Sequence, residues 1–295
     1  MSHRGIAAKR LQMATVISIH LCVASACTVD ETLDPAPCYE REDFTTKELC
    51  SVLTGACPGA TADGPTLSPV VTVVPDAPSM PKGVVSQAAH NNLDIVWHRD
   101  RLFFAFRTAP FHFAHHDVVL YVVSTRDQKT WQLEARFAMG KDLREPRFLP
   151  IGDRLFLYFA RLSEITFTFV PEAMHVSEQI AGCQWSAPEE ISPIGRDGFI
   201  PWRAREQDGA GHLIGYVGGE AIYEMEEGGV EVHWLKTSDG RHFQPAAGSE
   251  SRVLLGGSSE TDWAMLEDGG LVAVSRNESG DETGFGSKIC TAPAD

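Results

Sequence analysis

The fold is decided by a stretch that reads Asp100-Arg101-Leu102-Phe103-Phe104-Ala105-Phe106. A turn followed by an apolar strand returns three times, as Asp153-Arg154-Leu155-Phe156-Leu157-Tyr158-Phe159, Gly211-His212-Leu213-Ile214-Gly215-Tyr216-Val217 and Gly269-Gly270-Leu271-Val272-Ala273-Val274. The leading leucines stand at positions 102, 155, 213 and 271, so they are 53, 58 and 58 residues apart. A second ladder keeps the same phase, because Trp131, Trp185 and Phe243 follow their leucines by 29, 30 and 30 residues. Two ladders in one phase indicate a structural repeat of about 55 residues.

Each repeat predicts four short strands: one before the turn, the leucine strand, a third such as Val118 to Val123, and a fourth that opens at the aromatic residue. Helical periodicity is absent over any useful length. The sequence therefore predicts an all-β fold, a β-propeller of four-stranded antiparallel blades over residues 83–295. About four blades are visible, and the last is incomplete because its aromatic residue would fall near position 301, as 271 + 30 = 301, beyond Asp295. Either a strand at Val70 to Val74 completes a four-bladed ring, or final blades are missing.

Two turns carry a shared pattern of a hydroxyl, an aspartate, a tight turn and an aromatic residue. Thr237-Ser238-Asp239-Gly240-Arg241-His242-Phe243 has it in full, and Thr125-Arg126-Asp127-Gln128-Lys129-Thr130-Trp131 has it with Gln in place of Gly. The Asp carboxylate can accept backbone N–H bonds within its own turn, and Gly supplies the unusual dihedral. We expect these residues to build the fold rather than to perform chemistry: Asp127, Trp131, Asp239, Gly240 and Phe243.

The two turns resemble Asp-boxes, and residues 90–295 resemble the sialidase-type, Asp-box β-propeller superfamily. The resemblance implies six blades, as in sialidases, or five, as in related glycosidases. It also implies an exo-glycosidase that hydrolyses terminal, acidic sugars without a cofactor. The alternative is a propeller that binds a carbohydrate or a protein and catalyses nothing, since many propellers of this type only bind.

The candidate site lies on the face opposite the two turns, where loops between second and third strands and links between blades meet. Arginine forks bind carboxylates, and tryptophan faces stack on sugar rings. The substrate-binding candidates on this face are Arg107, Arg144, Arg147, Trp202, Arg203 and Arg276. Sialidases hold their substrate carboxylate with three arginines, and position favours Arg107, Arg203 and Arg276 for that role.

The catalytic carboxylates that we expect are Glu145 and Glu278, because neighbouring arginines and burial can tune their pKa values. The resemblance also implies a tyrosine nucleophile, for which Tyr216 and Tyr223 qualify only by location. Arg144-Glu145-Pro146 is also similar to the Arg-Asp-Pro signature of five-bladed fructan- and arabinan-type hydrolases, with Glu replacing Asp.

A histidine cluster stands in the predicted loop of the first blade. His112, His115, His116 and Asp117 offer three imidazoles and a carboxylate, which are ligands for divalent metals. Neither helix nor strand periodicity aligns them, so the sequence favours a solvated loop, and we expect no metal and no cofactor.

The first segment of the chain reads as an export signal. Arg4, Lys9 and Arg10 precede a mostly apolar run, and Ala24-Ser25-Ala26 supplies the small residues of a cleavage site, so residues 1–26 are predicted to be a signal peptide. The same residues resemble a bacterial lipobox that would place a lipid on Cys27. Plain secretion after cleavage at Ala26 stays open. We expect a periplasmic or extracellular protein, or an outer-membrane lipoprotein that meets the membrane only through its lipid.

Composition limits the partners of the exported chain. The full chain has 25 Lys and Arg residues against 40 Asp and Glu, a net charge of −15, and removal of Arg4, Lys9 and Arg10 makes the exported chain more acidic still. Such a charge repels phosphate backbones and argues against nucleic acid. A glycan or polysaccharide is the expected partner of a monomer. Residues 27–57 form a cysteine-containing stub, in which two of Cys38, Cys50 and Cys57 are expected to pair. Residues 58–82 form a Pro- and Thr-rich linker to the propeller domain at 83–295.

Overall fold

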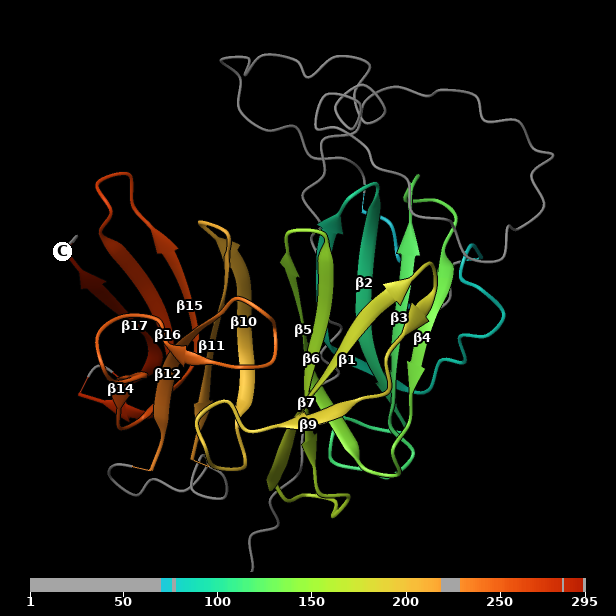
Figure 1. Cartoon of the computed structure of the whole chain (residues 1–295). Helices are drawn as coiled ribbons and strands as arrows, with labels where there is room; N and C mark the ends of the chain where they lie inside the picture. Colours follow the sequence, from blue (N-terminus) through green and yellow to red (C-terminus); the bar gives the residue numbers. More distant parts are fainter. Residues whose placement is uncertain (1–69, 76–77, 219–228, 283, 294–295) are drawn as a thin grey trace, which may run out of the picture.

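The regular elements of the computed structural model are all β-strands in the residues it describes, 70–75, 78–218, 229–282 and 284–293. They form four antiparallel sheets, one after another along the chain, arranged as the blades of a β-propeller (Figure 1). The predicted all-β propeller is confirmed. No helix in this part of the chain is long and apolar enough to cross a membrane.

The first two blades follow the predicted strand order. Blade 1 consists of β1 (Ala89–His98), β2 (Arg101–Ala109), β3 (Val119–Thr125) and β4 (Gln132–Phe137). Blade 2 consists of β5 (Asp142–Ile151), β6 (Arg154–Leu162), β7 (Pro171–Ala181), β8 (Gln184–Trp185) and β9 (Glu189–Ile191), with β8 and β9 both paired to β7. The fourth position is thus split into two short strands in blade 2.

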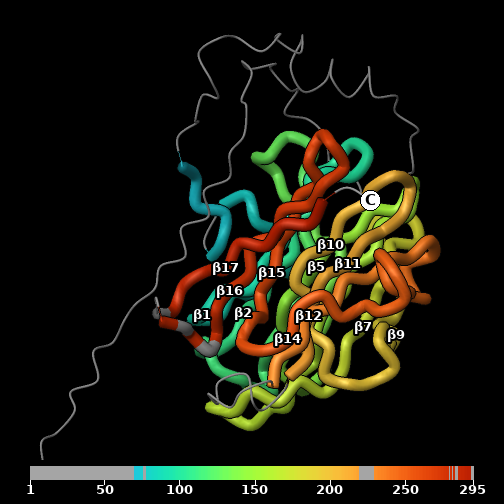
Figure 2. The backbone as a smooth tube through the Cα atoms, turned by 90° about the vertical axis from the view of Figure 1, so that its left-hand side faces the viewer, coloured from blue at the N-terminus to red at the C-terminus, as the bar shows by residue number. Residues whose placement is uncertain are grey.

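Blades 3 and 4 complete the described arc. Blade 3 consists of β10 (Ile200–Gln207), β11 (Ala210–Val217), β12 (Glu231–Thr237), β13 (Gln244–Pro245) and β14 (Arg252–Leu255). Blade 4 has three described strands, β15 (Ser258–Met265), β16 (Leu271–Asp281) and β17 (Gly284–Ala292). Blades 1 and 4 lie at opposite ends of the arc in Figure 1, and Figure 2 looks onto blade 4 with the others behind it.

The leucine ladder marks the second strand of every blade. Each of these strands lies between the inner strand and the third strand of its sheet. In blades 1 to 3 it also lies between two packed layers, so its residues are apolar on both faces. All nine residues of β2 are buried. This explains why the sequence shows a continuous apolar run there instead of alternation. The aromatic ladder marks the fourth strands, since Trp131 and Phe243 directly precede β4 and β13 and Trp185 lies in β8.

Apolar clusters join each blade to the next. One cluster packs Phe103 of blade 1 against Phe148 and Phe159 of blade 2. A second joins blade 2 to blade 3, and a third joins blade 3 to Trp263 and Ala273 of blade 4. Each pair of neighbouring blades therefore shares an apolar layer of its own.

The outer face of blade 1 is covered by the chain that leads into it. Val73, Val74, Met80 and Val84 pack against the cluster that contains Phe104 and Trp131. The alternative in which residues 70–74 supply the missing strand of blade 4 is therefore wrong, because these residues lie on blade 1 and belong to no described sheet. The outer face of blade 4 exposes apolar side chains, with Val274 and Ile289 paired across β16 and β17.

The two turns with the shared pattern have the same hydrogen bonds. Asp127 Oδ1 accepts from the backbone N–H groups of residues 129 and 130, at 2.8 and 2.7 Å. Asp239 Oδ1 accepts from those of residues 241 and 242, at 2.9 and 2.8 Å. Gln128 has φ 59° and Gly240 has φ 77°, so Gln takes at one turn the left-handed conformation that Gly takes at the other. These contacts fasten the turns on the face away from the candidate site.

The two described cysteines differ in their bonding. Cys183, in the turn between β7 and β8, is disulfide-bonded, whereas Cys290 is free. The predicted signal peptide, Cys27, Cys38, Cys50, Cys57 and most of the linker lie outside the described residues.

Candidate functional site

Each inner strand carries a bulge at the same level. The register with the second strand shifts between Asn91 and Leu93 in β1, between Arg144 and Arg147 in β5, between Pro201 and Arg203 in β10, and between Ser258 and Thr261 in β15. A bulge re-aims side chains and is common beside functional sites. Asn92 and Glu145 have φ values of 48° and 51°. Such a backbone is costly for a glutamate, so the surrounding structure must hold it.

The bulged residues meet around the propeller axis and form what we call the axial cluster: Asn92, Glu145, Arg147, Trp202 and Glu260. Asn92 donates a hydrogen bond to Glu145 Oε1, and Arg147 Nη2 lies 2.8 Å from Glu145 Oε2. Arg147 also donates through Nε to the carbonyl of Trp202, and its guanidinium lies 4.9 Å from the centroid of the Trp202 ring. The cluster thus links three blades around one carboxylate.

The electrostatic surroundings favour the neutral form of two glutamates. Burial raises the pKa of Glu145, and the charge of Glu260 raises it further, whereas Arg147 and Arg144 lower it. Burial also raises the pKa of Glu260, against the opposing effect of Arg276. A carboxylic acid whose proton is retained towards neutral pH is a candidate general acid.

A second group of charged side chains lies on the inner strands, just after the bulges in sequence. Asp94 accepts a hydrogen bond of 2.8 Å from the backbone N–H of Phe148, and burial raises the pKa of this aspartate. Arg203 lies 3.9 Å from Asp94 and 3.1 Å from Asp262, while 38% of its side chain is exposed. Arg203 is therefore a guanidinium that reaches solvent between two inner strands.

Blade 4 contributes a third set of charges. Arg276 Nη1 lies 3.0 Å from Glu260 and 3.3 Å from Glu278, and 47% of the Arg276 side chain is exposed. Ser259 donates a hydrogen bond of 2.6 Å to Glu278. Arg276 and Glu278 are thus connected to the axial cluster through Glu260.

Beneath the site lies a buried ion network. Arg107 is fully buried, and its guanidinium is bound to Asp142 at 2.8 Å and to the side chain of Asn91 at 2.8 Å. Arg144 lies 2.5 Å from the other oxygen of Asp142 and donates to the carbonyl of His112. These contacts fasten blade 1, blade 2 and the 110–118 loop to one another. In this structure Arg107 and Arg144 support the site from inside.

The predicted residues are therefore divided among three places. Glu145, Arg147 and Trp202 meet in the axial cluster, and Arg276 and Glu278 lie beside it. The arginines expected to act as a trio each bind a different carboxylate: Asp142 for Arg107, Asp262 for Arg203 and Glu260 for Arg276. Tyr216 is 4% exposed and packs against Trp202, whereas Tyr223 lies outside the described residues.

Sequence reasoning missed Asn92 and Glu260 in the cluster, and Asp142 beneath it. A signal was present, because Asn92 and Glu145 each precede their leucine by ten residues, while Trp202 and Glu260 each precede theirs by eleven. The leucine ladder thus indexes the inner strands as well as the second strands.

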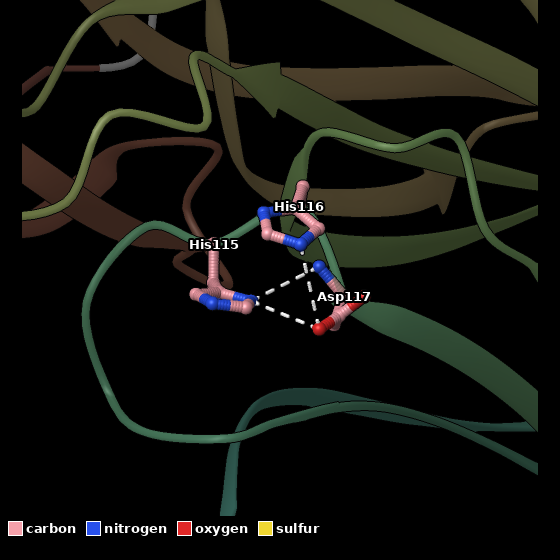
Figure 3. Close-up of side chains that lie close together, drawn as sticks. All are labelled: His115, His116 and Asp117. Atoms are coloured by element: carbon pink, nitrogen blue, oxygen red, sulfur yellow. Dashed lines mark hydrogen bonds and ion pairs between the residues drawn. The ribbon is translucent and has the colours of Figure 1, made fainter.

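A smaller group lies in the loop between β2 and β3, at the same end of the propeller. His115, His116 and Asp117 each offer one potential metal-ligating atom, and these atoms all lie within 4.8 Å of one another (Figure 3). His112 lies apart, with Nδ1 3.1 Å from the side-chain nitrogen of Asn91.

Comparison with known proteins bears on the fold. No protein-family model matches the sequence, and no curated protein matches it significantly. Among solved structures, a protein of unknown function from Dyadobacter fermentans superposes with a TM-score of 0.52 at 14% identity, over 71% of this chain and 68% of that one. The sialidase of Trypanosoma rangeli in complex with the inhibitor DANA superposes with a TM-score of 0.51 at 12% identity, over 70% of this chain. The chain spans 36% of the length of that sialidase. These likenesses establish the β-propeller fold, which the chain shares with a sialidase.

Proposed function

We propose that the protein is a glycan-directed propeller whose axial cluster hydrolyses a terminal, acidic sugar in the manner of an exo-glycosidase. The observation that carries this proposal is Glu145, a buried glutamate with a raised pKa on a left-handed backbone, held by Asn92 and Arg147. Such a residue suits the general acid that protonates a leaving glycosidic oxygen.

The surrounding side chains suit the rest of the reaction. Arg203 and Arg276 are half-exposed guanidiniums, which can form forked hydrogen bonds to a sugar carboxylate. Trp202 offers an aromatic surface for a sugar ring. Glu260 and Glu278 are the carboxylates available to stabilise positive charge that develops on the ring. Arg147 acts as a positioning residue, since its donors bind Glu145 and backbone carbonyls.

A second candidate function is binding without catalysis. Tyr216, the described tyrosine considered as a nucleophile, is 4% exposed in the core between blades 3 and 4. A propeller that lacks an accessible nucleophile can still hold a polysaccharide or a protein partner with the same arginines and tryptophan.

A cleavage and binding assay separates these functions. A fluorogenic sialoside and a panel of neutral glycosides would be tested with the wild type, Glu145→Gln and the control Glu190→Gln, whose carboxylate is half-exposed on β9. Hydrolysis that is lost only in Glu145→Gln supports the enzyme. Retention on immobilised glycans without hydrolysis supports the binding protein. The absence of both hydrolysis and retention would overturn the proposal.

We also propose that the chain is exported as a monomer and anchored by a lipid on Cys27, and that the two turns at 125–131 and 237–243 are Asp-boxes. The N-terminal sequence supports export and the lipid anchor, and the shared hydrogen-bond pattern supports the Asp-boxes. In a bacterial host, Cys27→Ala should move the protein from the membrane fraction to the soluble fraction. A wild type that is itself found in the soluble fraction would leave plain secretion as the better explanation, and a Cys27→Ala variant that stays in the membrane fraction would contradict the lipid anchor.

A further inference from the structure

We infer that His115, His116 and Asp117 form a binding site for a divalent transition-metal ion of the zinc class. The site lies in the 110–118 loop, outside the axial cluster, and it does not depend on the proposed glycosidase activity.

The geometry of the ligating atoms carries the inference. Asp117 Oδ2 lies 3.7 Å from His115 Nδ1 and 3.5 Å from His116 Nε2 (Figure 3). Ligands of a tetrahedral zinc ion, with bonds of about 2.0–2.1 Å, lie about 3.3 Å apart. Two of the three separations thus come close to a zinc geometry. The third, between the two imidazole nitrogens, is within 4.8 Å, so the two rings, whose centroids lie 4.3 Å apart, need to tilt until these nitrogens lie closer together.

The loop that presents these residues is fastened on all sides. Arg144 and Arg107 donate to the carbonyls of His112 and Phe113, and Gln87 donates to the carbonyl of Asp117. The ring of Phe113 lies 4.6 Å from that of Phe167 in the next loop. A loop held through its backbone loses little conformational entropy when its side chains take up an ion.

The chemistry of the ligands selects the ion. Imidazole nitrogen suits Zn²⁺, Ni²⁺, Co²⁺ and Cu²⁺, whereas Ca²⁺ requires six to eight oxygen ligands. Two imidazoles and one carboxylate leave the fourth position of a tetrahedral ion to water or to a further ligand. Glu164, from the loop of blade 2, lies near enough to His116 for the two charges to interact. An ion at this site would brace the rim of the candidate glycan site.

Binding of zinc by the full chain tests the inference. The protein would be stripped with a chelator and titrated calorimetrically with ZnCl₂, and then with CoCl₂ under visible absorption. We expect one ion per chain, a cobalt spectrum without the charge-transfer band of a thiolate ligand, and no heat with CaCl₂. The thiolate band separates this site from one that uses Cys290.

Two variants decide the assignment. His116 is 60% exposed, so His116→Ala should fold normally and should weaken zinc binding by at least about 100-fold, more than loss of an outer-shell partner costs. The matched control is His242→Ala, because His242 is an exposed imidazole that lies 2.6 Å from a single carboxylate, Asp239. Its zinc affinity should equal that of the wild type. Absence of zinc binding at about 1 mM, or equal binding by the wild type and His116→Ala, would overturn the inference.

Discussion

The carboxylate of Glu145 lies 2.8 Å from the guanidinium of Arg147, two residues further along β5, yet the pKa of Glu145 is raised. Burial of the carboxylate outweighs the attraction of the arginine, and Glu260 opposes ionisation further. The protein therefore holds an acid in a position that is unfavourable for its charged form, which is the arrangement of many catalytic carboxyl groups.

The first prediction concerns stability and pH. In the native state Glu145 retains its proton to a higher pH than in the unfolded chain, so the wild type loses stability as pH rises from about 4.3 towards the raised native pKa. Relative to the wild type, Glu145→Gln should therefore gain unfolding free energy as pH rises from 4 to 7, because the variant has no carboxyl group to ionise. The gain should vanish below about pH 4. Urea unfolding of both proteins between pH 4 and 7.5 measures this difference in unfolding free energy. A difference that favours the wild type more at pH 7 than at pH 4 would contradict the prediction.

The second prediction concerns the coupling of two carboxyl groups. Because Glu260 raises the pKa of Glu145, Glu260→Gln should lower the pKa of Glu145. Carbon-13 NMR of the glutamate carboxyl groups across a pH titration measures this shift. Glu267→Gln, an exposed residue of the same blade, is the control and should leave the pKa of Glu145 unchanged. An unchanged titration of Glu145 in Glu260→Gln would show that the two groups act independently.

The third prediction concerns the ion pair beneath the site. Arg107→Met removes one of the two arginines that bind the fully buried Asp142 and should cost at most about 3–5 kcal/mol of unfolding free energy, since Arg144 remains. The double variant Arg107→Met/Asp142→Leu should cost less than the sum of the single variants, since the two residues are in direct contact and each single variant already removes their interaction. Arg99→Ala breaks a pair whose aspartate, Asp153, is 78% exposed, and it should cost less than about 1 kcal/mol. Strict additivity in chemical denaturation would refute the coupling.

The fourth prediction compares the two turns. A Cβ atom at Gly240 would lie 2.5 Å from the ring of Phe156 and would adopt φ 77°. Gly240→Ala should therefore destabilise the protein by about 2–4 kcal/mol. At the other turn, Gln128→Gly relieves the left-handed backbone but adds freedom to the unfolded chain, so stability should change by less than about 1 kcal/mol. Thermal unfolding of both variants checks the difference, and equal effects would contradict it.

The repeat was readable because the second strands of blades 1 to 3 are largely buried on both faces. Burial on both faces requires apolar runs such as Leu102 to Phe106, and these recur wherever the architecture recurs. The same phase predicted the aromatic residues that open the fourth strands.

The details of the site were less readable for two physical reasons. The bulges at Asn92 and Glu145 are properties of pairing with the second strand, and alternation in one strand does not reveal where pairing shifts. The partner of Arg107 is Asp142, 35 residues away in another blade, which no local pattern indicates. The arginines in the sequence were enough to predict an anion-binding site. Which of these arginines can bind a ligand depends on the carboxylate that each one already contacts in the structure.

The most direct test of the central claim is calorimetric titration of a sialyl-oligosaccharide and its neutral counterpart into the full chain. We expect the acidic sugar to bind more tightly, and we expect Arg203→Ala to weaken its binding by the ~1.5–3 kcal/mol of a charged hydrogen bond, with Arg276→Ala acting in the same direction. Arg154→Ala is the matched control, since Arg154 pairs with Glu178 and lies 4.6 Å from the ring centroid of Phe156, much as Arg147 lies over Trp202. Unchanged binding by Arg203→Ala, equal loss in Arg154→Ala, or no binding of either sugar by the wild type would contradict the assignment of a glycan site to the propeller axis.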